Sequence, residues 1–254
     1  MRHTRPAKKP PSAASVDPAE VARFSALAES WWDPLGELSP LHKLNPVRIA
    51  YVRDKAAARF GRDAKRERPL RGLALLDIGC GGGLLAEPME RLGARVVGID
   101  ASERNIGVAR AHAEASGLAI DYRAATAEAL ASAGEHFDIV LAMEVVEHVA
   151  DLGAFLGACC ALTKPGGMMI VATLNRTPQS FAFAILGAEL LLRWLPLGTH
   201  DWRRFLRPSE LAAELRRRGA RVAELVGVRY SPLTDRFVLG ADLSVNYMAF
   251  VELA

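Results

Sequence analysis

Short apolar runs alternate with helix-like segments through the middle of this chain. Runs with the composition of buried strands lie near residues 73–78, 94–99, 121–123, 137–143 and 168–173. Apolar positions at helical spacing separate several of them, over 84–92, 104–116 and 152–162. Regular alternation of strands and helices indicates a parallel sheet that helices cover on both faces. The pattern therefore predicts a doubly wound α/β fold that binds its ligand at the carboxyl ends of the strands.

Helices, not strands, are expected before this core. Asp17 is a helix cap followed by proline and an acid, so a helix should begin there. The sequence Trp31-Trp32-Asp33-Pro34 ends it, and a loop over 35–45 leads through Pro46 into a second helix over 47–60. Residues 1–16 are rich in proline, alanine, serine and basic residues, which predicts a disordered tail.

The alternation stops after residue 176. An apolar stretch over 180–197 carries Glu189 and Arg193, so it makes a poor bilayer span. It is either a core helix or a lid that lies on a membrane surface. The remaining pattern predicts a helix at 208–218 and strands at 222–228, 237–240 and 245–253. We expect one domain over 17–254, made of an N-terminal helical cap (17–71), a core (72–176), and a lid helix with C-terminal strands (177–254).

Composition narrows the class of partner. The formal net charge is only +3 in 254 residues, which gives no reason to expect nucleic acid. The three cysteines, Cys80, Cys159 and Cys160, form neither a disulfide framework nor a metal-binding spacing, so a reducing, cytoplasmic compartment is expected.

The most informative motif follows the first strand. Asp77, Gly79, Gly81 and Gly83 form an Asp-x-Gly-x-Gly-x-Gly pattern, and the third glycine of a dinucleotide fingerprint is replaced by Leu84. This disfavours a nicotinamide-dependent dehydrogenase. The pattern resembles motif I of the class I S-adenosylmethionine (SAM)-dependent methyltransferases, and it implies their Rossmann-like fold.

Asp100 ends the second strand, one helix length after these glycines, where a carboxylate can accept both ribose hydroxyls. In the class I enzymes the glycine turn that begins with Asp77, Gly79 and Gly81 contacts SAM. The resemblance therefore assigns these four residues to the cofactor.

Narrower strings resemble the ubiquinone biosynthesis O-methyltransferases. They are the segment from Ser30 to Arg48, Met143-Glu-Val-Val-Glu-His148, Thr173-Leu-Asn-Arg176, Gly198-Thr-His-Asp201, and the segment from Asp242 to Met248. The resemblance covers nearly everything after residue 17. It implies that Arg48 neutralises the SAM carboxylate as a bidentate guanidinium, and that Met143 packs against the adenine.

Glu144, Glu147 and His148 are the candidate catalytic group. At i, i+3 and i+4 they would share one face of a helix that begins after the fourth strand. Such a trio can bind Mg²⁺, which the resemblance implies and which would lower the pKa of a catecholic substrate. The alternative needs no metal: Glu144 caps the helix dipole, and His148 is the general base.

The resemblance implies methylation of the phenolic hydroxyls of 2-polyprenyl-6-hydroxyphenol and 3-demethylubiquinol. The phenolate would displace the SAM methyl group directly. Expected partners are this polyprenylated substrate, anionic lipids at the inner membrane surface, and other enzymes of ubiquinone biosynthesis. Two alternatives stay open: a methylase of another quinone or small phenol, and a non-catalytic SAM-binding scaffold in a membrane-associated assembly. A nucleic-acid methyltransferase is disfavoured because Glu144-Val-Val-Glu147 replaces its Pro-Pro-aromatic string.

Overall fold

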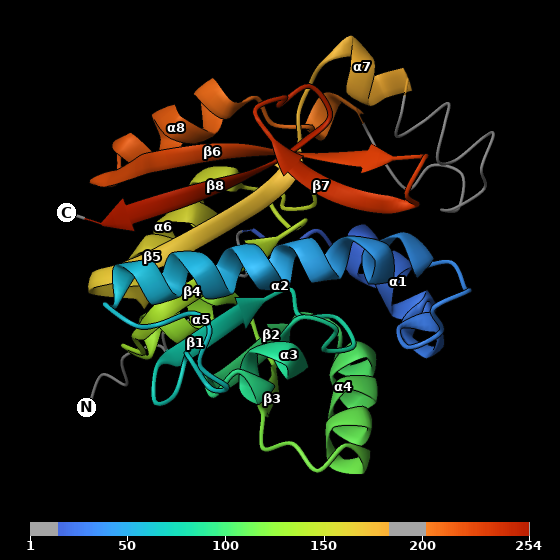
Figure 1. The fold of residues 1–254 in the computed structure, drawn as a ribbon, viewed down its shortest axis with the longest axis vertical. Coiled ribbons are helices and arrows are strands. Elements are labelled where there is room, and N and C mark those ends of the chain that lie inside the picture. Colours follow the sequence, from blue (N-terminus) through green and yellow to red (C-terminus); the bar gives the residue numbers. More distant parts are fainter. Residues whose placement is uncertain (1–14, 183–201, 254) are drawn as a thin grey trace, which may run out of the picture.

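One twisted sheet organises the computed structural model, which describes residues 15–182 and 202–253. Its strands are β1 (Ala74–Ile78), β2 (Arg95–Asp100), β3 (Asp121–Ala124), β4 (Phe137–Met143), β5 (Thr163–Leu174), β6 (Ala220–Ser231), β7 (Arg236–Gly240) and β8 (Asn246–Leu253). Their order is β3-β2-β1-β4-β5-β8-β6-β7 (Figure 1). The pairings among β1 to β5 are parallel, whereas β8 pairs antiparallel with both β5 and β6. The predicted doubly wound, mostly parallel sheet is confirmed.

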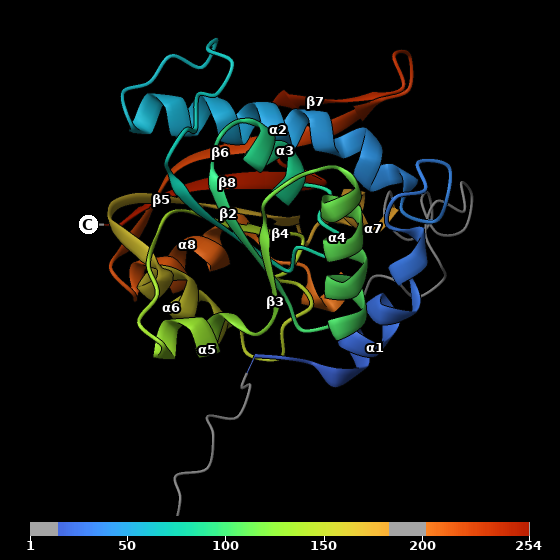
Figure 2. The ribbon, with the colours of Figure 1, turned by 90° about the horizontal axis from the view of Figure 1, so that it is seen from below.

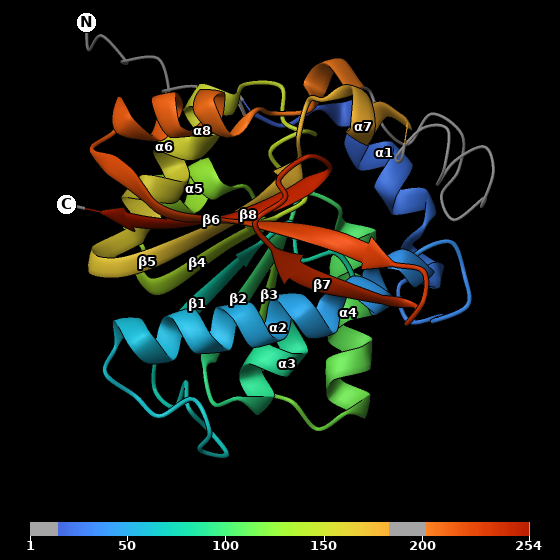
Figure 3. The same cartoon turned by 45° about the horizontal axis from the view of Figure 1, so that its top comes forward.

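Helices cover both faces of this sheet. The described helices are α1 (Pro18–Ala26), α2 (Ser39–Arg59), α3 (Ala86–Arg91), α4 (Glu103–Ala115), α5 (Ala127–Ser132), α6 (Leu152–Leu162), α7 (Pro178–Phe181) and α8 (Pro208–Arg216), with 3₁₀ turns at Ala28–Ser30 and Trp202–Arg204. Figures 2 and 3 show α2, α3 and α4 on one face, and α5, α6 and α8 on the other.

Successive residues of the central strands point to opposite faces of the sheet and belong to two separate hydrophobic cores. Leu75 and Ile139 join the cluster under α2 and α3, whereas Leu76 and Val140 join the cluster under α5 and α6. All four side chains are fully buried. Burial on both faces explains why these strands have continuous apolar runs instead of an alternating pattern.

The structure corrects two expected boundaries. Helix α2 begins at Ser39, although the loop was expected to continue to Asn45, and Pro46 lies inside this helix. Burial of Leu44 and Val52 against neighbouring elements offsets the hydrogen bond that a proline cannot donate.

The strand expected near 168–173 is longer, because β5 begins at Thr163 and includes residues 164–167. The register advances from Phe137 opposite Thr163 to Ile139 opposite Met168, so the extra residues form a bulge.

The segment expected as a lid helix falls mostly outside the described residues. Only α7, capped by Thr177, belongs to the described part of that stretch. In the described ranges 15–182 and 202–253, no helix is long and apolar enough to span a bilayer.

Candidate active site

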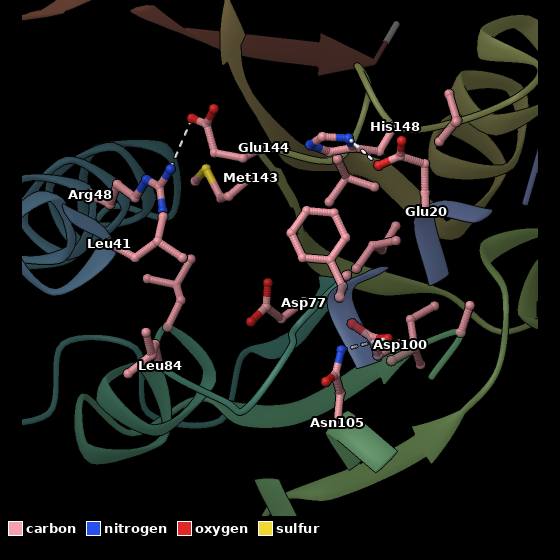
Figure 4. Close-up of a pocket in the computed structure, with 18 of the residues that line it drawn as sticks. Glu20, Leu41, Arg48, Asp77, Leu84, Asp100, Asn105, Met143, Glu144 and His148 are labelled. Atoms are coloured by element: carbon pink, nitrogen blue, oxygen red, sulfur yellow. Dashed lines mark hydrogen bonds and ion pairs between the residues drawn. The ribbon is translucent and has the colours of Figure 1, made fainter. Parts of the chain in front are cut away.

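A cavity of about 430 Å³ lies at the carboxyl ends of β1, β2 and β4, a volume typical of small-molecule sites (Figure 4). The strand ends contribute Asp77, Asp100 and Met143 to its lining. Helices α1 and α2 and the β6–β7 hairpin enclose it further, with residues such as Leu41 and Tyr230. The site therefore joins elements from nearly the whole chain, as expected for an open α/β sheet.

The glycine turn after β1 must lie close to other parts of the protein. A Cβ on Gly81 would come within 2.3 Å of the Trp31 ring, and one on Gly79 within 2.5 Å of Val145. Both glycines also have positive φ, 53° for Gly81 and 70° for Gly79. Only glycine meets both requirements, so the predicted motif forms a tight turn at the floor of the cavity.

Asp77 and Arg48 provide opposite charges in the same cavity. Both are buried, and among the described residues no donor reaches Oδ2 of Asp77. Burial raises the pKa of Asp77 to about 7, although the positive charge of Arg48 opposes this rise. A buried carboxylate with one unpaired oxygen and a guanidinium in the same cavity are complementary to a zwitterionic amino-acid group, because Asp77 can accept from an ammonium while Arg48 donates to a carboxylate.

Asp100 is held at the end of β2 by three donors. Its Oδ1 accepts from the Ser102 amide at 2.8 Å and from the Asn105 side chain at 3.3 Å, and its Oδ2 accepts from the Gly81 amide at 3.1 Å. Burial raises its pKa, and the hydrogen bonds to Ser102, Gly81 and Asn105 oppose this rise. The carboxylate is therefore fixed in orientation beside the glycine turn.

Glu144 does not lie on a helix, which corrects the expected helical face. It is a bend residue with φ of 55°, and no helix forms between β4 and α6. Its Oε1 accepts from Arg48 at 2.8 Å and from Asn246 at 3.2 Å. The strained backbone turns the chain out of the sheet at the cavity edge, and strain of this kind is frequent at functional sites.

Glu147 and His148 have partners of their own. Glu147 is fully enclosed and accepts a hydrogen bond from Thr173 at 2.9 Å. Burial, together with the negative charge of Glu144, raises the pKa of Glu147 well above its usual range. His148 Nδ1 lies 2.9 Å from a Glu20 carboxylate oxygen in α1, and this hydrogen bond lowers the pKa of Glu20 (Figure 4).

The predicted metal trio is therefore not assembled. Glu144 is engaged by Arg48, Glu147 by Thr173, and His148 by Glu20. Within the described part of the chain, no three His, Cys, Asp or Glu side chains gather as a metal ion would require. The residues as they stand do not fit the Mg²⁺ that the resemblance implies.

Three residues of the site had no role in the sequence interpretation. Glu20 reaches His148 from α1, while Trp31 and Asn105 contact the glycine turn and Asp100. The Trp-Trp string was visible as a family signature, but nothing in its pattern indicates that the indole lies on glycines fifty residues away. Contacts between distant segments carry no local periodicity.

The fold and this cavity define a class I SAM-dependent methyltransferase. Residues 76–171 match the family model of the methyltransferase domain. Among solved structures, the magnesium protoporphyrin IX methyltransferase of Synechocystis with bound SAM aligns over 95% of this chain and 99% of its own, with a TM-score of 0.60 and 17% identity. A SAM-dependent methyltransferase of Clostridium acetobutylicum aligns with a TM-score of 0.63 and 12% identity, over 91% and 99% of the two chains. At these identities the likeness establishes the fold.

Sequence similarity narrows the class to one family. The ubiquinone biosynthesis O-methyltransferase of Parvibaculum lavamentivorans is 58% identical over 94% of this chain and 95% of its own length. That of Sinorhizobium fredii is 58% identical over 92% and 94% of the two chains. The chain belongs to the ubiquinone biosynthesis O-methyltransferases, and it is a SAM-dependent O-methyltransferase.

Proposed function

We propose that this enzyme transfers the methyl group of SAM to the phenolic hydroxyls of 2-polyprenyl-6-hydroxyphenol and 3-demethylubiquinol. The observation that carries this proposal is one cavity with an amino-acid-binding end and an imidazole. Asp77 and Arg48 provide the first, and His148, backed by Glu20, provides the second. A methyl acceptor seated beside His148 would lie in the same space as the bound cofactor.

The cofactor pose follows from the charges around the cavity. Arg48 would pair with the SAM carboxylate, Asp77 with its ammonium group, and Asp100 with the ribose hydroxyls, while Gly79 and Gly81 let the backbone lie close.

Met143 ends β4 and lines the same cavity as Arg48 and Asp100 (Figure 4). Packing of its side chain against the adenine of SAM, which the resemblance implies, stays a prediction.

His148 is proposed as the general base. In the tautomer that carries its proton on Nδ1, this nitrogen would donate to Glu20, and Nε2 would take the phenolic proton. The phenolate oxygen then forms a bond to the methyl carbon as the carbon–sulfur bond breaks, and the electron pair stays on sulfur. The leaving group is the neutral thioether of S-adenosylhomocysteine, so no proton donor is needed. Positioning of the two bound reactants supplies much of the acceleration.

The direct test is methyl transfer from labelled SAM to short-tailed demethylubiquinol and to the corresponding 2-prenyl-6-hydroxyphenol. Turnover of both supports the proposal. Turnover only with unprenylated phenols would indicate the methylase of another small phenol. SAM binding without turnover of any of these acceptors would favour the non-catalytic scaffold.

The same assay with EDTA tests the Mg²⁺ requirement. The negative charge of Glu144 raises the pKa of Glu147, so the two carboxyl groups lie close together, but with their present hydrogen-bond partners they and His148 form no metal site among the described residues. Turnover that survives EDTA supports deprotonation by His148 alone. Turnover that EDTA abolishes and Mg²⁺ restores would mean that Glu144, Glu147 and His148 leave their present partners to surround the ion.

SAM affinity is expected to rise with pH up to about 7. The raised pKa of Asp77, about 7, keeps its carboxyl protonated below that pH, and only the ionised form attracts the SAM ammonium. In the ligand-free protein the sign is opposite: the folded state holds this proton more tightly than the unfolded chain, so stability falls as pH rises from about 4 to 7. Calorimetric titration between pH 5.5 and 7.5 would measure the affinity. Asp77→Asn should flatten the profile, and an unchanged slope in this variant would contradict the assignment.

Contact with an anionic membrane surface is proposed at the β6–β7 hairpin. Leu233 at its turn is 99% exposed, and Arg229 and Arg236 on its strands are also exposed. An apolar tip flanked by basic residues suits a surface of anionic lipids. Sedimentation with phosphatidylglycerol vesicles should lose binding in Leu233→Ser, whereas phosphatidylcholine vesicles should bind little of either protein. Equal binding of both proteins to anionic vesicles would contradict this surface.

A further inference from the structure

Trp31 connects the N-terminal cap to the cofactor cavity. Its ring lies directly over the glycine turn, where it would meet a Cβ on either Gly81 or Gly82. Its Nε1 donates to Oδ1 of Asn105 at 3.1 Å. Both side chains are buried, Trp31 with 8% and Asn105 with 1% of its surface exposed. The cap is therefore joined to α4 by a hydrogen bond that water does not weaken.

This bond decides which way the Asn105 amide faces. An indole nitrogen can only donate, so the amide oxygen must point toward Trp31 and the amide nitrogen away from it. The nitrogen then lies 3.3 Å from Oδ1 of Asp100 (Figure 4). The opposite amide orientation would set an oxygen against the Asp100 carboxylate, which is repulsive.

The backbone of Asn105 is fixed by the start of α4. Ser102 caps this helix, and its Oγ accepts from the Asn105 amide at 3.2 Å. The same Oγ lies 2.6 Å from Oγ of Ser25 in α1, a second link between cap and core. Ser102 therefore fixes the backbone of Asn105 and Trp31 fixes its side chain, so that the amide nitrogen donates to Asp100.

We propose that Asn105 is a positioning residue for cofactor binding: oriented by Trp31, it aims the Asp100 carboxylate at the ribose hydroxyls of SAM. Docking of the N-terminal cap thereby sets how strongly the core recognises ribose. The inference rests on the proposed role of Asp100, because it concerns the same carboxylate. It adds a second requirement: the N-terminal cap must be docked against the core before Asp100 can bind the ribose at full strength.

The test compares two ligands, S-adenosylhomocysteine and its 2′,3′-dideoxy analogue, which lacks the ribose hydroxyls. Calorimetry on the full-length protein gives the ratio of the dissociation constant of the analogue to that of S-adenosylhomocysteine. Asn105→Ala and Trp31→Phe are expected to weaken S-adenosylhomocysteine about tenfold relative to the analogue, since each loses a buried hydrogen bond that serves Asp100. Trp31→Phe keeps an aromatic ring over the glycine turn, so it isolates the effect of the indole donor.

Trp32→Phe is the matched control. Trp32 also donates from its indole to the glycine turn, to the Gly82 carbonyl at 2.9 Å, but it has no link to Asp100. It should affect the two ligands equally and leave the ratio unchanged. A ratio that stays at the wild-type value in Asn105→Ala and Trp31→Phe would overturn the inference and leave these residues a purely structural role.

Failure of the underlying assignment has a different signature. If the wild-type protein and Asp100→Asn show the same ratio, Asp100 does not bind the ribose, and the proposed cofactor pose is wrong. If Asp100→Asn lowers the ratio but Asn105→Ala does not, the pose stands and only the positioning role fails.

Discussion

Replacing His148 by alanine is expected to lower kcat by about 10²–10⁴ with little change in SAM affinity. That range is typical for removal of a general acid–base group, and His148 is the one side chain that we propose to take the phenolic proton. His148 reaches the cavity next to Glu20, and it belongs to the acceptor side of the proposed pose. Single-turnover transfer from labelled SAM would measure the chemical step, and calorimetry the affinity.

The control for this variant is His136→Ala. His136 is exposed and close to the Ala161 carbonyl, and it precedes the amino end of β4, whereas the cavity lies at the carboxyl end of that strand. It should leave kcat unchanged. A His148→Ala enzyme that keeps the wild-type rate would rule out this base and move attention to the carboxylates of Glu144 and Glu147.

Gly81→Ala is the second variant with a large expected effect. Its new Cβ would lie 2.3 Å from the Trp31 ring, at a backbone φ of 53°. Strain of this kind costs about 1–3 kcal/mol, and the indole has to leave its place over the turn. If the strain falls on the SAM-bound state, affinity drops by about 5- to 150-fold. Calorimetry and thermal unfolding would separate lost affinity from lost stability.

Gly107→Ala provides the comparison within the same fold. Gly107 lies inside α4, and a Cβ there would have no atom within 4 Å. It is expected to raise the free energy of unfolding by about 0.5–1 kcal/mol, because alanine loses less backbone freedom in a helix. A Gly81→Ala protein that binds SAM as the wild type does would show that the turn and Trp31 can separate without cost.

The core of the fold was predictable because local signals agree there. The strands that begin at Ala74 and Arg95 are apolar runs, and α6 spans Leu152–Leu162 as predicted. The beginning of α2 was not predictable in this way. Proline suggests a boundary, but the burial of Leu44 and its neighbours against the core overrides that local preference.

The candidate site likewise has a part that the sequence predicts and a part that it does not. The motif spacing predicted that Asp77, Gly79 and Asp100 lie together, and all three line the cavity, because the ends of adjacent parallel strands share one edge of a sheet. The expected helical face at 144–148 failed because the spacing of charged residues says nothing about backbone φ. The positive φ of Glu144 turns the chain out of the sheet, and Glu144 and Glu147 accept hydrogen bonds from different residues, Arg48 and Thr173.

The placement of β8 has a consequence for how the chain folds during synthesis. This strand lies between β5 and β6, yet it is made after both of them and after β7. Until it inserts, two strands present unpaired edges that could join to other chains. The sheet can therefore be completed only after Asn246–Leu253 has been made, and a chain that lacks this strand is expected to aggregate through the exposed edges of β5 and β6.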